Sequence, residues 1–571
     1  GLYSHQNNWH CYDALVYITN SLGPKLGTMP RRRVLAGLAL ALFLPLLLAI
    51  LLAVVDAAEP VPADVPPAIF TVKGLVHAFR AFWDIVGPGG KLHPAYFLEH
   101  KGHLVIEGIL IALIVYLALQ HSFKVHRRAE DPLTDKEIDQ LCKEWKPEPL
   151  VPTIPEAEQL PEPPVITGLD GPYVYLQGRK EKVLHLASSN YLNVANDRVS
   201  KEVSVNTVNK YGVGSCGPRG FYGTIDVHLQ LEQELAVHFG TEAGIIYSYD
   251  VATITSVIPC FANRKDIIVI DEFCSYPIQA GCNVSRARVA TFRHNDVADL
   301  ERVIQKLEAE EKAKRKPLCR KLIVVEGIYG NYGDLAPLDR IWQVKDKYKY
   351  RLMVDESHAF GVLGATGRGA CEHFNLKPGQ VEIVAASMSH AMGSVGGFCV
   401  GDRATVEHQR LCGSGYCFSA SLPPYLAVSG INMLKSLRGE APLAGSGGAA
   451  GGSGKELMVR LQARIRTMRG ELLRGLTGLK LYGGGGPSPI LHFHLAKPSG
   501  DYAADHATLR AVADHMLTHG SVLVSVSLYS VLDTHKPPPS LLMHVHAGLS
   551  DKDLAVAAGA LRRAVKEVLK Q

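Results

Sequence analysis

Two short segments of this 571-residue chain carry side chains that could do chemistry, and the first is VDESHAFG, which contains Asp355 and His358. The segment follows an apolar stretch, so the carboxylate is predicted to stand at the end of a buried strand, with the imidazole three residues on. In that arrangement a carboxylate can bind the protonated ring nitrogen of a flat heteroaromatic cofactor, and an imidazole can bind a ring oxygen. Taken alone the pair is a weak signal, because Asp and His at strand ends are often structural.

The second segment is SMSHAMGSVGG, which runs from Ser387 to Gly397 and follows the apolar run VEIVAA. It brings hydroxyls, an imidazole and three glycines together at the predicted end of a strand. Strand ends that turn on glycines are where α/β folds bind ligands. The segment has no lysine, cysteine or carboxylate, so His390 is either the working residue of a site or the mark of a site that has been lost.

Alternating strands and helices must position these segments. Short apolar runs such as Asp266–Ile270, Lys321–Gly327 and Arg351–Ser357 are separated by helical stretches. This alternation predicts a mainly parallel sheet covered on both faces. We expect a large α/β domain over residues 165–422 and a smaller C-terminal α/β domain over residues 423–571, which contains a glycine-rich flexible loop at 441–454.

Composition excludes several classes of function. Apolar residues make up 47% of the chain and charged residues 20%, as in a globular protein with added membrane segments. The net charge of +5 is small, and no basic stripe is interleaved with aromatic residues, so nucleic acid is not expected as a partner. The eleven cysteines form no C-x-x-C pair, which predicts reduced thiols in a cytosol-facing domain and no metal site.

Membrane segments are predicted near the N-terminus. Residues 1–28 show no periodicity, and we interpret them as a non-native or disordered leader. Val34–Val55 is a run of 22 uncharged residues, enough to cross a bilayer, so residues 29–58 are predicted as a transmembrane or signal-anchor segment. The small residues near Ala57 leave cleavage of a signal peptide open as the alternative.

A second apolar run, Leu104–Leu119, predicts a transmembrane helix over residues 104–120. Glu107 lies near one end, where a carboxylate costs less than the about 2.5–3.5 kcal/mol expected at mid-helix. The alternative is a buried core helix. Three arginines precede the first predicted span and basic residues follow the second, which places both flanks in the cytosol and residues 59–103 in a lumenal loop.

Residues 121–164 are predicted to hold an amphipathic helix and a proline-rich connector. The segment TDKEIDQLCKEW begins with a capping box, Thr134 and Glu137. Helical spacing then places four apolar residues on one face: Ile138, Leu141, Cys142 and Trp145. Such a helix can lie on a membrane or dock on a partner, and both interpretations remain open.

Six segments taken in order resemble a known family. They are YGVGSCGPRGFYGT, HNDVADLERV, VVEGIYGNYGDLAPLDRI, VDESHAFGVLGATGRG, GGFCVG and GYCFSASLPP. The chain is identified as a member of the α-oxoamine synthases, and it is most similar to the first long-chain-base subunits of serine palmitoyltransferase, particularly the plant type. The resemblance extends from about Leu104 to the C-terminus. It implies the aminotransferase-like fold of pyridoxal-phosphate enzymes (fold type I) that condense an amino acid with an acyl-CoA and release carbon dioxide.

The chain departs from the catalytic members of that family at the lysine position. In those members the glycine-rich stretch carries the lysine that binds the cofactor aldehyde as a Schiff base, and His390 stands there in this chain. An imidazole can transfer a proton but cannot form that imine. No lysine occurs between Lys377 and Lys435 that could substitute locally.

Three further departures agree with this one. Ser275 stands where the resemblance implies a histidine stacked on the cofactor ring, and Asp250 where it implies a glycine beside the phosphate. A carboxylate and a phosphate ~4 Å apart repel by about 4 kcal/mol at an effective dielectric of ~20. Residues 521–549 contain no arginine to hold a substrate carboxylate. We therefore expect no catalytic residue in this chain, with three vestigial cofactor-binding residues, Asp355, His358 and Ser387.

The resemblance also implies a site shared between two chains. Five residues fall in segments that face the neighbouring subunit in the family: Cys216, Arg219, Tyr222, Ser419 and Ser421. One interpretation is that they help to complete the partner's site in trans, and the other is that they only hold the interface. For Cys216 packing is favoured, because no adjacent base is visible to activate the thiol.

These observations predict a non-catalytic, lysine-lacking subunit of serine palmitoyltransferase, which condenses L-serine with palmitoyl-CoA to 3-ketosphinganine. The partner would be the catalytic long-chain-base subunit, which holds pyridoxal 5'-phosphate. The expected location is the endoplasmic reticulum membrane with a cytosolic globular domain, where small activating and regulatory membrane subunits could join the complex. Two alternatives remain: an active homodimeric α-oxoamine synthase, and a membrane scaffold or regulatory protein.

Overall fold

A computed structural model describes residues 110, 135–151, 162–314, 317–445, 451–483, 486–529, 533 and 535–569. The chain divides into two compact units, Gly1–Pro155 and Glu156–Gln571. Apart from Leu110, the predicted leader, membrane segments and lumenal loop lie outside the described residues. Within the described ranges, no helix is both long and apolar enough to cross a membrane.

The described part of the first unit contains one helix of ten residues, α6 (Asp135–Glu144). It confirms a helix in the predicted segment Thr134–Trp145, and Trp145 follows its last residue. None of its residues is buried, and the apolar face that includes Ile138 and Leu141 is exposed. Thr134, and with it the predicted capping box, lies outside the described residues.

A seven-stranded sheet forms the centre of the second unit. Its strands, in spatial order, are β4 (Ala243–Tyr247), β10 (Gly397–Gly401), β9 (Ile383–Ser387), β8 (Arg351–Asp355), β7 (Lys321–Glu326), β5 (Ile267–Asp271) and β6 (Arg288–Phe292). Strand β10 is antiparallel to both of its neighbours, and every other pair in the sheet is parallel. The prediction of a mainly parallel sheet is confirmed, with one antiparallel strand inserted.

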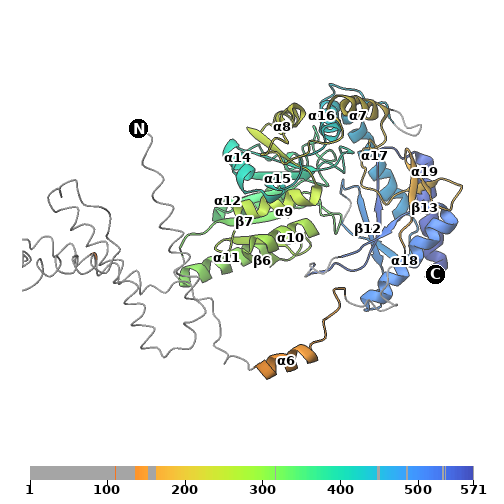
Figure 1. The fold of residues 1–571 in the computed structure, drawn as a ribbon. Helices are drawn as coiled ribbons and strands as arrows, with labels where there is room; N and C mark the ends of the chain where they lie inside the picture. The colour runs from red at the N-terminus through yellow and green to blue at the C-terminus, as the bar shows by residue number, and fades with distance from the viewer. Residues whose placement is uncertain are drawn as a thin grey trace, which may run out of the picture. The chain divides into compact units, whose positions relative to one another are not determined.

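Helices surround this sheet (Figure 1). They are α7 (Arg198–Tyr211), α8 (Asp226–Phe239), α9 (Asp250–Phe261), α10 (Tyr276–Ser285), α11 (Val297–Ala313), α12 (Leu338–Tyr348), α13 (Ala370–His373), α14 (Arg403–Cys412), α15 (Ser414–Cys417) and α16 (Pro424–Leu437). Helix α9 packs on β9 and β10 and lies beside α10, while α11 contacts β6 and α12 contacts β8. The central strands are apolar and buried because helices exclude water from them, as expected for a parallel sheet.

Two four-stranded sheets complete the unit. One consists of β1 (Ile166–Asp170), β2 (Tyr173–Leu176), β3 (Val183–His185) and β13 (Val522–Leu523); the other of β11 (Leu479–Leu481), β12 (Ile490–Leu495), β15 (Leu541–His544) and β14 (Ser525–Val526). The C-terminal helices are α17 (Gly454–Leu473), α18 (Tyr502–Gly520) and α19 (Asp551–Val568). The predicted boundary between residues 422 and 423 stays a prediction.

Backbone contacts tie the C-terminal region to the segment that precedes α7. Strand β13 pairs parallel with β3. The His544 N–H donates to the Leu186 carbonyl at 2.7 Å, and the Ala547 N–H donates to the Tyr191 carbonyl at 2.8 Å. These contacts hold residues 186–191 in place, and that segment supplies two side chains to the site described next.

Candidate functional site

The predicted site residues meet at one edge of the seven-stranded sheet. Because β10 is antiparallel to both neighbours, Gly397 at its start lies opposite Tyr247 at the end of β4 and Ser387 at the end of β9. Parallel pairing with β9 brings the end of β8 to the same edge. The structure therefore brings the ends of these strands together, as the sequence patterns predicted for an α/β fold.

Asp355 is the last residue of β8, and its carboxylate is almost completely buried. It accepts hydrogen bonds from the Ser357 N–H at 2.9 Å and from the Ser357 hydroxyl at 2.5 Å. The Ser387 N–H donates to that same hydroxyl at 2.9 Å, which links the ends of β8 and β9. Burial raises the pKa of Asp355, and the hydrogen bonds from Ser357 oppose that rise.

Two other buried carboxyl groups lie near Asp355. Glu326 ends β7 directly opposite Asp355, and Glu356 is the next residue along the chain. Burial raises the pKa of Glu326 above its usual range, with the charge of Asp355 adding to the effect, and burial raises the pKa of Glu356 to about 7. The contacts that lower these pKa values are hydrogen bonds from backbone and side-chain groups, none of which is a cation. Among the described residues, no positively charged group contributes to the pKa values of these three carboxyl groups.

His390 and His358 stack on each other beside these carboxyl groups. Their ring centroids are 4.3 Å apart with an angle of 23° between the planes. His390 Nδ1 lies 2.6 Å from the Ser189 hydroxyl, and His358 Nδ1 lies 2.8 Å from the Tyr191 hydroxyl. Burial lowers the pKa of His390 to about 4 and the pKa of His358 well below its usual value. Both rings are therefore neutral at pH 7, and neither is a cation that could compensate the carboxyl groups.

Asp250 is the first residue of α9 and turns its carboxylate toward the end of β9. Its Oδ1 atom is buried without a hydrogen-bond partner. Burial raises the pKa of Asp250, and the nearby hydroxyls of Ser389 and Ser387 and the Gly396 backbone oppose that rise. A carboxylate therefore stands at a helix N-terminus, a position that favours an anion.

These residues do not fit pyridoxal phosphate. No primary amine stands at the end of β9, since His390 occupies the position that the resemblance assigns to the lysine. At the start of α9, where the resemblance implies a glycine beside the phosphate, the chain has the Asp250 carboxylate, which would repel a phosphate. Ser275, at the predicted ring-stacking position, is the N-cap of α10 and offers no ring.

The predicted trans residues fall into two groups, and the first is exposed. Tyr222 is fully exposed and Cys216 is exposed, and both adopt left-handed backbone angles, with φ of 63° and 58°. Gly223 is required between them and the following helix, because a Cβ there would lie 1.9 Å from the Gly217 carbonyl oxygen. Strained, exposed residues in one turn are typical of a functional surface.

The second group points into the chain itself. Arg219 is buried and forms a salt bridge with Glu232 at 2.9 Å. Ser421 is buried, and both its N–H and its hydroxyl donate to the Gly217 carbonyl at 2.9 Å. Ser419 is partly buried. Arg219 and Ser421 thus hold the turn in shape, while Tyr222 and Cys216 are the members that a partner could reach directly.

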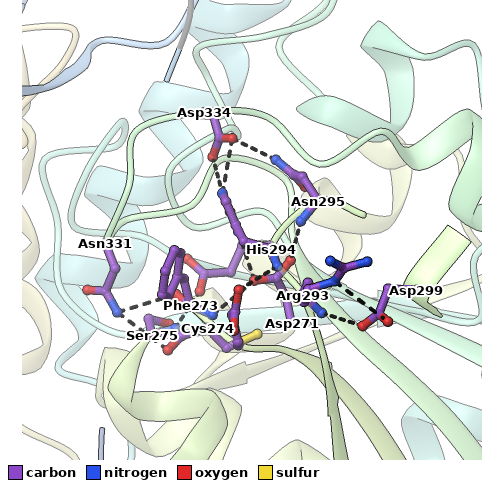
Figure 2. A network of polar contacts seen from close by, with 12 residues as sticks. Asp271, Phe273, Cys274, Ser275, Arg293, His294, Asn295, Asp299, Asn331 and Asp334 are labelled. Atoms are coloured by element: carbon purple, nitrogen blue, oxygen red, sulfur yellow. Dashed lines mark hydrogen bonds and ion pairs between the residues drawn. The ribbon is translucent and has the colours of Figure 1, made fainter. Parts of the chain in front are cut away.

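Sequence reasoning missed a second polar network at the same sheet edge (Figure 2). His294 follows β6 and lies between two carboxylates, with Nδ1 2.8 Å from Asp271 and Nε2 3.0 Å from Asp334. Asn295 Nδ2 also donates to Asp334, at 2.7 Å. Although burial opposes it, the two carboxylates raise the pKa of His294 to about 10, so this imidazole is charged at pH 7. The segment HND could have signalled it, but the two acidic partners are distant in sequence.

Comparisons with known proteins agree with this geometry. Residues 181–561 match the family model of aminotransferase class I and II. Long chain base biosynthesis protein 1b of Oryza sativa subsp. japonica is 40% identical over 468 residues, which cover 82% of this chain and 92% of that protein. Serine palmitoyltransferase 1 of Dictyostelium discoideum is 38% identical and covers 82% and 94%.

The chain belongs to this family of first long-chain-base subunits of serine palmitoyltransferase. A solved serine palmitoyltransferase from S. paucimobilis, with PLP and myriocin bound, is 25% identical with a TM-score of 0.62, over 72% of this chain and 94% of that one. The fold is therefore the aminotransferase-like fold of pyridoxal-phosphate enzymes. Pyridoxal phosphate is the cofactor of the family, and the family's chemistry is that of a transferase.

Proposed function

We propose that this chain is the non-catalytic subunit of serine palmitoyltransferase, which condenses L-serine with palmitoyl-CoA to 3-ketosphinganine, the first step of sphingolipid synthesis. A catalytic long-chain-base subunit is the partner. It binds pyridoxal phosphate, supplies the lysine and receives both substrates at a site between the two chains. This chain stabilises the partner and completes the wall of that site.

The observation that carries the proposal is the presence of His390 in the loop after β9 and of Asp250 at the start of α9, the helix that follows β4. One lacks the amine that pyridoxal chemistry requires, and the other places a negative charge where a phosphate would bind. The remaining carboxyl groups, Asp355 among them, lie buried without a cation. A protein of this family with that site is best explained as a partner for an active chain.

A surface for the partner lies at the edge of the same site. Ser421 ties the turn at residues 213–224 to the segment at 418–421, and the Ser248 hydroxyl donates to the Ala420 carbonyl. Four large apolar side chains are exposed on these connected segments: Phe221, Tyr222, Tyr249 and Phe418. Exposed aromatic residues are enriched at protein interfaces. We infer that this aromatic rim, defined by those four residues, contacts the catalytic subunit.

The proposal places the complex at the endoplasmic reticulum membrane, with the globular unit in the cytosol. The predicted spans at residues 29–58 and 104–120 would anchor it, and basic residues flank them on the cytosolic side. A membrane anchor suits this reaction because the acyl substrate and the product both carry long alkyl chains. Small activating or regulatory membrane subunits would join at the same membrane.

The test is a visible absorbance spectrum of the purified chain with pyridoxal phosphate, recorded alone and after co-expression with the catalytic subunit. We expect a band near ~420 nm, whose electronics belong to the cofactor, that responds to L-serine only in the pair. A serine-responsive band from this chain alone would overturn the proposal and favour the active homodimer. Full condensation by the purified partner without this chain would instead favour a scaffold.

A further inference from the structure

Cys412 and His408 form a pair at the end of α14. Cys412 is the last residue of the helix and His408 lies one turn before it, with 3.8 Å between Cys412 Sγ and His408 Nδ1. The other ring nitrogen, Nε2, lies 2.9 Å from the Cys260 carbonyl oxygen. Because a carbonyl can only accept, Nε2 carries the proton and donates, which leaves Nδ1 of the neutral ring as an acceptor. The Cys412 thiol therefore faces the nitrogen that can take its proton.

This arrangement is that of a nucleophile beside a base that a third group holds in place. The Phe261 ring also packs on the base, with its centroid 5.5 Å from that of His408. Cys142 and Cys216 are exposed as Cys412 is, but neither of those two thiols forms a hydrogen bond within the described ranges. The dipole at a helix C-terminus disfavours a thiolate, so activation of Cys412 depends on His408.

A second thiol lies on the next turn of the chain. The one-turn helix α15 ends at Cys417, whose N–H donates to the Gly413 carbonyl at 2.9 Å. The Cys417 thiol donates to the Arg410 carbonyl at 3.3 Å, so its sulfur is turned back toward α14. Burial and the neighbouring Cys412 raise the pKa of Cys417, so little of this thiol is ionised at pH 7. Of the two, Cys417 is suited to react second.

His408 also lines a cavity of about 610 Å³, a size typical of sites for small ligands. Basic side chains outnumber acidic ones around it, with Arg320, Lys321, Lys349 and Arg351 against Glu382 and Asp402. Lys321 and Lys349 form ion pairs with acids outside the cavity, whereas Arg320 forms none among the described residues. A small molecule that carries carboxylates therefore fits beside the Cys412–His408 pair.

We propose that Cys412 is a modification site for small carboxylate-bearing disulfides, and that Cys417 then closes an internal disulfide with it. The Cys412 thiol gives its proton to His408 Nδ1, and its sulfur attacks one sulfur of the reagent. The S–S bond of the reagent breaks, and one half leaves as a thiolate that takes up the proton. The Cys417 thiol displaces the second half from Cys412 in the same way. Both cysteines are oxidised, and the reagent is reduced to two thiols.

The internal disulfide would act on the aromatic rim. Phe418, a member of that rim, directly follows Cys417 and is 84% exposed. Oxidation removes the S–H proton of Cys417 and with it the hydrogen bond to the Arg410 carbonyl, so the end of α15 shifts and carries Phe418 with it. This consequence rests on the proposed function, under which the oxidised chain binds the catalytic subunit less well.

Oxidised glutathione is the probe, added to the purified full-length chain, with the products followed by intact mass and located by peptide mapping. We expect the unaltered chain to gain the internal disulfide, Cys417→Ser to stop at the mixed disulfide with glutathione, and Cys412→Ser to form neither. Cys142→Ser removes another exposed thiol and serves as the matched control, with the rate at Cys412 unchanged. Cystamine, a disulfide with amines in place of carboxylates, should react several-fold more slowly.

His408→Gln tests the base, because its amide can still donate to the Cys260 carbonyl but cannot take the thiol proton. We expect the reaction of Cys412 to slow about tenfold, less than the about 10²–10⁴-fold of an optimised base because the contact of 3.8 Å is long. Thermal unfolding checks the fold, and His408→Asn is the second variant. No product at Cys412, an unchanged rate in the folded His408 variants, or equal rates with cystamine would overturn the inference and leave the proposed function intact.

Co-purification with the catalytic subunit gives the second readout. The oxidised chain should retain less partner than the reduced chain, and Cys412→Ser should retain the same amount under both conditions. Equal retention by the oxidised and reduced chain would overturn the link between Cys412 and the aromatic rim. Failure of the reduced chain to bind the partner at all would instead overturn the proposed function.

Discussion

Two groups of buried acids and histidines lie along the same edge of the central sheet, and they differ in how their charges are balanced. Around His294, one protonated imidazole lies between two carboxylates, with a pKa raised to about 10. Around Asp355, the imidazoles are neutral and the carboxyl groups have raised pKa values. The first network, formed by Asp271, His294 and Asp334, is a satisfied structural unit. In the second, formed by Glu326, Asp355 and Glu356 with His358 and His390, no described cation is paired with the acids.

The difference shows how burial acts on acids and histidines with and without a partner of opposite charge. Desolvation penalises every ionised group, and only a partner of opposite charge reverses the effect. In the His294 network that partner is part of the chain, so its histidine is held charged. In the Asp355 site the family's cofactor would supply the positive ring; in this chain burial raises the pKa values of the carboxyl groups and keeps the histidines neutral.

The largest effect is expected from removing the cation of the satisfied network. His294→Ala leaves Asp271, which is completely buried, and Asp334 close together without their partner. Breaking a buried ion pair in this way costs about 3–5 kcal/mol of unfolding free energy. Denaturant unfolding of the purified chain measures it, with the exposed His519→Ala as the control, for which we expect a change within about 0.5 kcal/mol. A loss as small as that of the control would show that His294 is not charged in the folded chain.

The contributions of His294 and His390 to the unfolding free energy are expected to change with pH in opposite directions. The pKa of His294 is raised, so the stability that it contributes is complete below pH 6.5 and is lost as the pH rises toward about 10. The pKa of His390 is lowered, so its contribution is present above pH 6.5 and is lost as the pH falls toward about 4. The destabilisation caused by His294→Ala should therefore shrink between pH 7 and about 10. Relative to the unaltered chain, His390→Asn should gain stability between pH 7 and about 5.

Unfolding free energies measured across pH, for each variant against the unaltered chain, test this pair. Slopes of the same sign would contradict the comparison between the two networks. If the unfolding free energies of His390→Asn and the unaltered chain differ by the same amount at every pH, His390 is as well solvated in the folded chain as in the unfolded chain.

Replacement of a buried acid in the unbalanced site should stabilise the chain. Asp355→Asn keeps an acceptor for the two hydrogen bonds from Ser357 and removes a carboxyl group whose pKa is raised by burial. A raised carboxyl pKa destabilises the fold as the pH rises through it, so the gain should be about 1–2 kcal/mol at pH 8 and should vanish near pH 4. Thermal unfolding at the two pH values measures it.

The matched control for that variant is Asp226→Asn. The Tyr211 hydroxyl donates to Asp226, and this contact lowers the pKa of that carboxyl, so the control should not stabilise the chain. Activity of the complex gives a second readout for Asp355→Asn. Under the proposed function it is retained, whereas loss of activity with the fold intact would mean that Asp355 serves a working site.

The smallest effect on stability is expected at the aromatic rim. Tyr222 is fully exposed, so Tyr222→Ala should change the unfolding free energy by less than about 0.5 kcal/mol. Association of the Tyr222→Ala variant with the catalytic subunit should nevertheless weaken, as measured by the fraction of partner that co-purifies. Arg219→Ala should mainly lower the unfolding free energy and affect co-purification less, because Arg219 is buried in a salt bridge with Glu232 and supports the turn from inside. Equal co-purification of Tyr222→Ala and the unaltered chain would remove Tyr222 from the interface.

Much of the fold could be predicted from the sequence because the buried strands are continuous apolar runs. The run predicted over Arg351–Ser357 became β8, and that over Lys321–Gly327 became β7, each ending within two residues of the prediction. The antiparallel insertion of β10 was not predictable in this way. An apolar strand that is buried on both faces has no sequence pattern that distinguishes parallel from antiparallel pairing. Only the neighbouring strands in the folded sheet determine its direction.

The absence of a lysine near His390 was determined by the sequence itself, and so was the presence of Asp250. Which residues surround them was decided by tertiary structure. Tyr247 at the end of β4 and Ser387 at the end of β9 flank Gly397 only because β10 inserts between these two strands. Asp334 reaches His294 across 40 residues of chain. Residue types are local facts, whereas charge balance depends on distances between groups that the chain brings together only when it folds, and burial then sets which of them are ionised.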